Sequence, residues 1–160
     1  MDPLQSIRVC DVMDTTVPVI PPSMKVRELC DRIARGDPQL TPRQATPIVD
    51  EYGNLCGIIT RGDLVRALKG NPEGNSTVCE AGSRKVIVAY QDELLRDAVD
   101  RMLEHGIGRL MVVSRENPRK FVGYLGRSRV LAARLIKLKE EVERAQGAVN
   151  TSSRESDPMP

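Results

Sequence analysis

The sequence has few aromatic side chains: no tryptophan, one phenylalanine and three tyrosines among 160 residues. A surface that stacks on exposed bases needs several aromatic rings, so an RNA-binding module of that kind is excluded. An excess of positive charge is missing as well, because 24 lysines and arginines stand against 22 aspartates and glutamates. This balance argues against a grip on nucleic acid that depends on bulk charge.

The sequence also lacks a long hydrophobic run. Its longest apolar stretches, residues 86–90 and 110–113, have the length of a β-strand and fall short of the ~18 residues of a membrane span. At the N-terminus no basic segment precedes an apolar one, so we expect no secretory signal and place the chain in the cytoplasm. The composition is otherwise that of a globular domain with its own core.

Metal-ligating side chains are scarce and scattered. No two cysteines have the Cys-x-x-Cys spacing and His105 is the single histidine, so we expect no metal. His105 precedes Gly106 at the predicted end of a helix, where a histidine suits the helix dipole, and no catalytic nucleophile pattern lies beside it. We expect free thiols and no structural disulfide at Cys10, Cys30, Cys56 and Cys79.

What the sequence does contain is an internal repeat. Val9-Cys10-Asp11 returns 69 positions later as Val78-Cys79-Glu80, and Gly57-Ile58-Ile59 returns 66 positions later as Gly123-Tyr124-Leu125. A period of this length is too long for a solenoid unit and indicates a duplicated small domain. One copy of ~60 residues would leave a sheet face exposed, so we expect the two copies to pack about a pseudo-two-fold axis.

Both copies show the same order of predicted elements: strand, helix, strand, strand, helix. The fold class is therefore α/β (α+β), with a small three-stranded sheet and two helices in each repeat. Ser23 and Asp92 are the predicted N-caps of the first helix in each copy. The strands are expected at 17–20, 47–49 and 55–60 and at 86–89, 110–113 and 121–125, with closing helices at 63–69 and from 128 onward. The predicted boundaries are 7–70 for the first repeat, 76–140 for the second, and 141–160 for a helix end and a disordered tail, the tail running from residue 147.

Two stretches of the first copy resemble the CBS domain, which is named after cystathionine β-synthase. They are Pro47–Gly53, an apolar strand before an acidic turn, and Gly57–Asp63, where a glycine, two apolar residues and a threonine precede an aspartate. Two CBS copies form a CBS pair, or Bateman module, and the resemblance covers roughly residues 7–140. Residues 89–106 and 121–128 also resemble the second CBS repeat in cytoplasmic tails of bacterial ClC-type chloride channels and transporters.

The resemblance implies an adenine-nucleotide site at Thr60 and Asp63. The hydroxyl and the carboxylate would bind the ribose, and the opposite copy would hold the adenine. The residues alone support a plainer role as well, because Thr60-x-x-Asp63 at a helix start has the pattern of a capping box. By position in the family, the other lining residues would be Ile58 and Ala45 of the first copy and Gly82, Ile87, Ile107 and Gly108 of the second, although the isoleucines also fit a core role and the glycines a turn role.

The second copy departs from the pattern. Gly126 stands where Thr60 stands, and Arg129 stands where Asp63 stands. A guanidinium has five donors and no acceptor, so it cannot receive the ribose hydroxyls, and the resemblance supplies no second ribose site. Arg129 is expected to contact a phosphate, to be solvated or to be paired.

These features together predict a regulatory module without catalytic activity. It would sense AMP, ADP or ATP and control an attached or partner protein, by the resemblance a ClC-type chloride channel or transporter whose transmembrane domain would place the module at the cytoplasmic face. We expect a homodimer through the CBS pairs and no nucleic acid as partner. Three alternatives stay open: a ligand-free dimerisation module, a stand-alone regulator of a metabolic enzyme, and, most weakly supported, an enzyme.

The predicted last helix carries an apolar stripe. Leu131, Leu135, Leu138 and Val142 are spaced by four, three and four residues, which places them on one helix face. The stripe would pack on its own domain or against a partner, and contact with a partner is the interpretation we favour.

Overall fold

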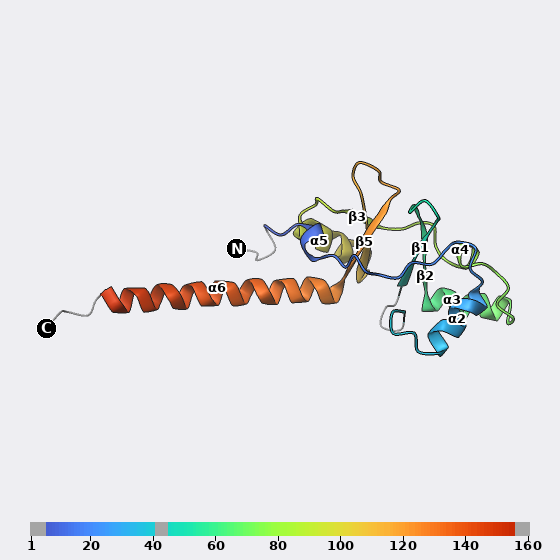
Figure 1. Cartoon of the computed structure of the whole chain (residues 1–160), viewed down its shortest axis with the longest axis horizontal. Helices are drawn as coiled ribbons and strands as arrows, with labels where there is room; N and C mark the ends of the chain where they lie inside the picture. The colour runs from blue at the N-terminus through green and yellow to red at the C-terminus, as the bar shows by residue number, and fades with distance from the viewer. Residues whose placement is uncertain (1–5, 41–44, 156–160) are drawn as a thin grey trace.

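The computed structural model describes residues 6–40 and 45–155, with side chains up to residue 148. Two small α/β units lie side by side, and one long helix extends away from them (Figure 1). We call the units the first and the second repeat. In chain order the elements are α1 (Val9–Val12), α2 (Val26–Ala34), β1 (Ala45–Val49), β2 (Leu55–Thr60), α3 (Arg61–Gly70), α4 (Val78–Ala81), β3 (Val88–Tyr90), α5 (Leu95–His105), β4 (Arg109–Val113), β5 (Phe121–Gly126) and α6 (Arg127–Glu155).

The sheet of the first repeat is smaller than predicted. β1 and β2 form the expected antiparallel hairpin, and Ile20 adds only an isolated parallel bridge to Ile48. Pro18 and Pro21 lie on either side of this bridge. Because proline has no backbone N–H, neither residue can donate to a ladder, and the predicted strand at 17–20 is reduced to one bridged residue.

The sheet of the second repeat has the three predicted strands, in the order β3-β4-β5. β3 runs parallel to β4, and β4 pairs antiparallel with β5. The helix α5 connects β3 to β4, as a parallel pair requires a crossover. It ends at His105, and Gly106 follows in the left-handed conformation at φ 62°, which confirms the predicted helix end.

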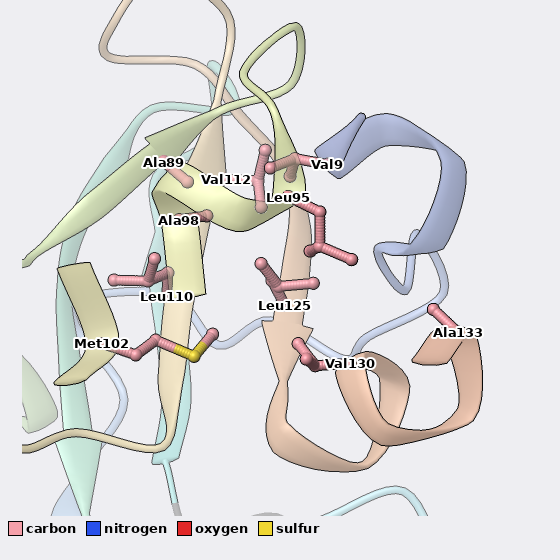
Figure 2. Packing of buried hydrophobic residues seen from close by; sticks show 10 residues of the cluster. All are labelled: Val9, Ala89, Leu95, Ala98, Met102, Leu110, Val112, Leu125, Val130 and Ala133. Atoms are coloured by element: carbon pink, nitrogen blue, oxygen red, sulfur yellow. The ribbon is translucent and has the colours of Figure 1, made fainter. Parts of the chain in front are cut away.

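The short helices α1 and α4 pack into each other's repeat. Val9 of α1 is fully buried in the second repeat, where Leu95 and Val112 belong to the same cluster (Figure 2). Val78 of α4 is fully buried in the core of the first repeat, beside Ile48. This exchange joins the two repeats and accounts for the sequence motif that both short helices share.

Tertiary contacts, and not the predicted side chains, cap the helices that follow. The N-cap residue of α2 is Lys25 and that of α5 is Leu94, so the prediction of Ser23 and Asp92 is wrong. The first N–H groups of both helices donate instead to backbone carbonyls in the segments that lead into α4 and α1. Val26 N donates to Ser76 O at 2.9 Å, and Leu95 N donates to Ile7 O at 2.7 Å. These bonds satisfy the first backbone N–H groups of the two helices. In a prediction from sequence, a nearby polar side chain is expected to accept from such groups.

The last helix is longer than predicted. α6 continues to Glu155, so residues 147–155, predicted as part of a disordered tail, are helical, and 156–160 lie outside the described residues. Gly147 weakens a helix by only about 1 kcal/mol relative to alanine, and no proline occurs between Arg127, where α6 begins, and Pro158. Nothing in that stretch therefore forces the helix to end.

Candidate functional site

The corner between β2 and α3 holds the predicted pair Thr60 and Asp63. Asp63 N donates to Thr60 Oγ1 at 3.1 Å, and Thr60 N donates to Asp63 Oδ2 at 2.8 Å, which confirms the capping box. The second carboxylate oxygen, Oδ1, contacts the guanidinium of Arg66. The Asp63 side chain is only 12% exposed, whereas that of Arg66 is 71% exposed. A ligand that uses Oδ1 would therefore displace an exposed surface side chain and leave the cap in place.

This corner opens onto a cavity of about 240 Å³ between the repeats, which we call the Asp63 cavity. Five of the predicted residues meet there, from both repeats: Ile58, Thr60, Asp63, Ile87 and Ile107. Sequence reasoning missed the other five lining residues, Ser83, Lys85, Val86, Arg109 and Met111. The cavity thus combines apolar walls, a carboxylate and two cationic side chains.

Three predicted residues do not line the Asp63 cavity. Ala45 is buried at 1% exposure opposite Thr60 in the β1–β2 ladder. Gly82 ends α4, and a Cβ on it would lie 2.4 Å from Ile58 O, so its role is close packing against β2. This packing supports the reciprocal backbone hydrogen bonds between Ile58 and Ser83, at 2.8 and 3.0 Å. Gly108 lines a different cavity.

Arg109 is the most informative of the missed residues. It begins β4 in the second repeat, at the place that Ala45 holds in β1 of the first, because Arg109 pairs with Gly126 as Ala45 pairs with Thr60. The sequence repeat carried this signal, since residues aligned with a predicted lining residue are themselves candidates. Arg109 lines both cavities, so one cation lies between them.

The corner between β5 and α6 opens onto a larger cavity of about 540 Å³, which we call the Arg129 cavity. As predicted, this repeat supplies no threonine or carboxylate at the corner. The carboxylate comes from Asp14 of the linker after α1, whose Oδ1 lies 3.8 Å from Arg129 Nη2. The same oxygen accepts from Thr16 N and Thr16 Oγ1, both at 2.9 Å. Arg129 is thus paired, one of the roles predicted for it.

The remaining candidate chemistry is limited in the residues that the structure describes. Within them, no group of three histidine, cysteine, aspartate or glutamate side chains gathers to hold a metal. The four cysteines are free thiols, and burial raises the pKa of the Cys30 and Cys56 thiols. Among the described helices, none combines the length and apolar character needed to cross a membrane.

Comparison with known sequences points to one family. The CBS domain matches residues 9–70 and again residues 78–136. The L-aspartate semialdehyde sulfurtransferase of Methanocaldococcus jannaschii is 39% identical over 77 residues, which is 48% of this chain and 14% of that protein. A probable arabinose 5-phosphate isomerase of Haemophilus influenzae is 34% identical over 112 residues, 69% of this chain and 32% of the isomerase. The chain therefore spans a third or less of these relatives.

Solved structures show the same fold. A putative acetoin utilization protein (AcuB) from Vibrio cholerae superposes with a TM-score of 0.70 at 23% identity, over 84% of this chain and 96% of that one. The CBSX2 protein in complex with AMP gives 0.68 at 23% identity, over 81% and 97%. The CBS domain pair of protein MJ0100, in complex with 5′-methylthioadenosine and S-adenosyl-L-methionine, gives 0.62 at 28% identity, over 83% and 98%.

Proposed function

Because the chain belongs to the CBS-domain family, as a tandem CBS pair or Bateman module, we propose that it binds an adenine nucleotide and regulates an attached or partner protein. The observation that carries the proposal is the Asp63 cavity, where a carboxylate, three isoleucines and two cations from different repeats line one space. Each of these groups suits a different part of a nucleotide. Binding, and not turnover, is the proposed activity.

The carboxylate suits the ribose. Asp63 Oδ1 would accept hydrogen bonds from the two ribose hydroxyls once Arg66 moves aside, and hydrogen bonds to a charged acceptor are the stronger kind. Oδ2 would stay with Thr60 N, so binding would not require the helix cap to break. The cap and the ligand would therefore use different oxygens of one side chain.

The walls suit the base and the phosphate. Ile58, Ile87 and Ile107 present apolar surface on which a purine ring could lie. Lys85 and Arg109 add positive charge to the same cavity, which favours a phosphorylated ligand over free adenosine. The relatives support the adenosine part, since CBSX2 is described with AMP and MJ0100 with two adenosine-containing ligands.

The cavity also suggests how occupancy would reach another protein. Because both repeats line it, a ligand would bridge them and favour one arrangement of the pair. The coupling would be limited to the difference in the ligand's affinity for the two arrangements. No metal is needed in this scheme, and we propose that the pair acts as a homodimer through its CBS repeats.

The host protein is a separate part of the proposal. The chain covers a third or less of the curated relatives reported above, so in them the matched segment is part of a longer protein. Those relatives are named as enzymes, and they do not favour the ClC-type channel or transporter that the second repeat resembles. We keep that host, at the cytoplasmic face of the membrane, as one proposal, and a cytoplasmic metabolic enzyme as the other.

A ligand-free dimerisation module is the second candidate function. The capping box explains Thr60 and Asp63 without any ligand, and Arg66 already occupies the remaining carboxylate oxygen. This candidate predicts that no adenine nucleotide binds in the range of cellular concentrations.

Calorimetric titration with AMP, ADP, ATP and adenosine separates the candidates. We expect at least one nucleotide to bind, Asp63→Asn to weaken it more than tenfold, and Lys85→Met to weaken the nucleotide but not adenosine. The amide oxygen of the introduced asparagine would still accept from Thr60 N, which keeps the cap. Glu80→Gln is the matched control, because Glu80 holds the same helix position in α4, exposed and away from the cavity. Absence of heat for all four ligands would favour the ligand-free module.

A further inference from the structure

Besides the buried contact that α6 makes with the second repeat, the helix carries an exposed apolar stripe that the CBS repeats do not cover. Leu131, Leu135, Leu138 and Val142 are 53%, 66%, 44% and 55% exposed. With Ala145 they recur at alternating spacings of four and three residues, which is the seam of a two-stranded coiled coil. We call these five residues the α6 seam.

The seam faces away from the protein's own core. α6 packs on the second repeat through Val130 and Ala133, which are buried, with Lys137 half-buried on the same side. At about 100° per residue, the seam lies roughly 135° around the helix from that contact. Figure 1 shows the helix continuing well beyond the body of the molecule. Among the residues whose side chains the structure describes, none therefore covers the seam.

We propose that the α6 seam pairs with the same seam of a second copy, with the two helices antiparallel. The charged residues beside the seam favour the antiparallel over the parallel arrangement. Arg134 and Glu141 flank the seam on one side, one heptad apart, and Lys139 flanks it on the other. An antiparallel pair brings equivalent flanks together, whereas a parallel pair brings opposite flanks together.

Only the antiparallel arrangement matches opposite charges. When Leu135 packs against the partner's Leu138, Arg134 of each copy faces Glu141 of the other, which makes two oppositely charged pairs. A parallel pair in register places Arg134 beside the partner's Lys139, which makes two repulsive pairs instead. Each copy's own ion pairs leave this intact, since Glu140, and not Glu141, is the intrahelical partner of Lys137 and Arg144.

The arrangement also leaves room for the repeats. Antiparallel pairing about the middle of the seam places Ala133 of one copy opposite residue 140 of the other. Ala133 is where α6 packs on the second repeat of its own chain. The two bodies then lie at opposite ends of the helix pair, on the outside. This interface is separate from the Asp63 cavity and from a dimer through the CBS repeats, so it stands or falls independently of nucleotide binding.

Sedimentation equilibrium of the whole chain tests the seam with two neighbouring residues. Leu135→Glu should weaken the association step made by the α6 seam more than tenfold, an order-of-magnitude expectation for two lost leucine contacts, and should leave a dimer through the CBS repeats in place. Ile136→Glu is the matched control, because Ile136 is similarly exposed at 60% but points about 100° away from Leu135. Far-UV circular dichroism should show unchanged helix in both. A monomeric wild-type chain, or equal effects of the two variants, overturns the proposal.

A charge exchange tests the direction of the pair. Arg134→Glu should weaken an antiparallel dimer several-fold, because it places two glutamates together, and adding Glu141→Arg should restore association. A parallel dimer would respond to the single change in the opposite way, since the introduced glutamate would then face the partner's Lys139. Strengthening by the single change, or no rescue by the double change, therefore overturns the antiparallel arrangement. Nucleotide affinity should be unchanged throughout.

Discussion

The two cavities lie at corresponding corners of the two repeats but have opposite chemistry. In the first repeat, Thr60 and Asp63 supply acceptors at the start of α3. In the second, Gly126 and Arg129 stand at the corresponding positions at the start of α6, and the carboxylate beside Arg129 comes from Asp14 in a linker. The carboxylate that lines the larger cavity is therefore already paired with an arginine. Under the proposed assignment of the ribose to Asp63, the smaller of these two cavities is the nucleoside site.

The strands that lead into these corners differ as well. A Cβ on Gly57 of β2 would lie 2.5 Å from Ser83 O, a backbone atom held by the ladder to Ile58. A Cβ on the corresponding Gly123 of β5 would meet the side chain of Met13 at 2.7 Å. The nearest obstacle is thus a backbone carbonyl in the first repeat and a side chain that has other rotamers in the second, where the backbone carbonyl of Asp14 lies farther off, at 3.3 Å.

The largest expected effect comes from filling these two glycines. Gly57→Ala should lower the free energy of unfolding by about 3 kcal/mol, because a fixed backbone carbonyl must move. Gly123→Ala should lower it by about 1 kcal/mol or less, because Met13 can turn aside. Urea denaturation of both variants makes the measurement. Equal losses would show that the two corners are equally rigid.

The exchanged short helices give the next largest effect. Val9 and Val78 are both fully buried, each in the core of the other repeat. Val9→Ala and Val78→Ala should each cost about 2 kcal/mol, and each should shift a single cooperative transition. Thermal denaturation followed at two wavelengths checks this. Separate transitions for the two repeats would mean that the exchange does not couple their folding.

Binding is expected to distinguish the corners by more than tenfold. Asp63→Ala should reduce nucleotide affinity by that amount or abolish binding, whereas Arg129→Ala should change it less than about threefold. Binding should saturate at one nucleotide per chain. Two equivalent sites, or affinity that Asp63→Ala leaves unchanged, would contradict the assignment of the ribose to the first repeat.

The smallest expected effect is a local response of the β1–β2 turn to low pH. Asp50 in the β1–β2 turn accepts from Asn54 N and Tyr52 N, both at 2.9 Å, and these backbone hydrogen bonds hold its pKa below the usual value near 3.9. A lowered pKa stabilises the fold above pH ~4, and that contribution is lost as the pH falls through the folded-state value. The β4–β5 turn has Ser114 at the corresponding place, which does not titrate there.

Amide NMR signals of the two hairpin turns make this comparison. Between pH 5 and pH 2.5, an order-of-magnitude window around the aspartate pKa, the signals of Tyr52 and Asn54 should shift and that of Asn117 should not. Asp50→Asn should remove the difference. Parallel shifts in both turns would mean that acid acts on the whole fold and not on Asp50.

The sequence predicted the part of the candidate site that the first repeat supplies, but it missed the cationic side chains that the second repeat adds. The cap formed by Thr60 and Asp63 was found because a capping box lies within four residues of chain, whereas their proposed ligand role came from the family resemblance. Lys85 and Arg109 were missed because the family resemblance, which placed Ile87 and Ile107 of the same repeat, was not extended to them, and the alignment of Arg109 with Ala45 in the repeat was not used. Gly82 and Ala45 were assigned to the lining by their place in a family pattern, whereas the structure uses one for close packing and the other for the core.

The sequence by itself determined the duplication, the two hairpins, the positions of the main helices along the chain and the cap at Asp63. Each of these depends on periodicity or on residues close together in the chain. Only the tertiary structure decided the rest. The exchange of α1 and α4 places backbone carbonyls of one repeat at the helix starts of the other, which made the predicted caps at Ser23 and Asp92 unnecessary. The same exchange brings Asp14 to Arg129, because groups far apart in the chain meet only when the two cores close.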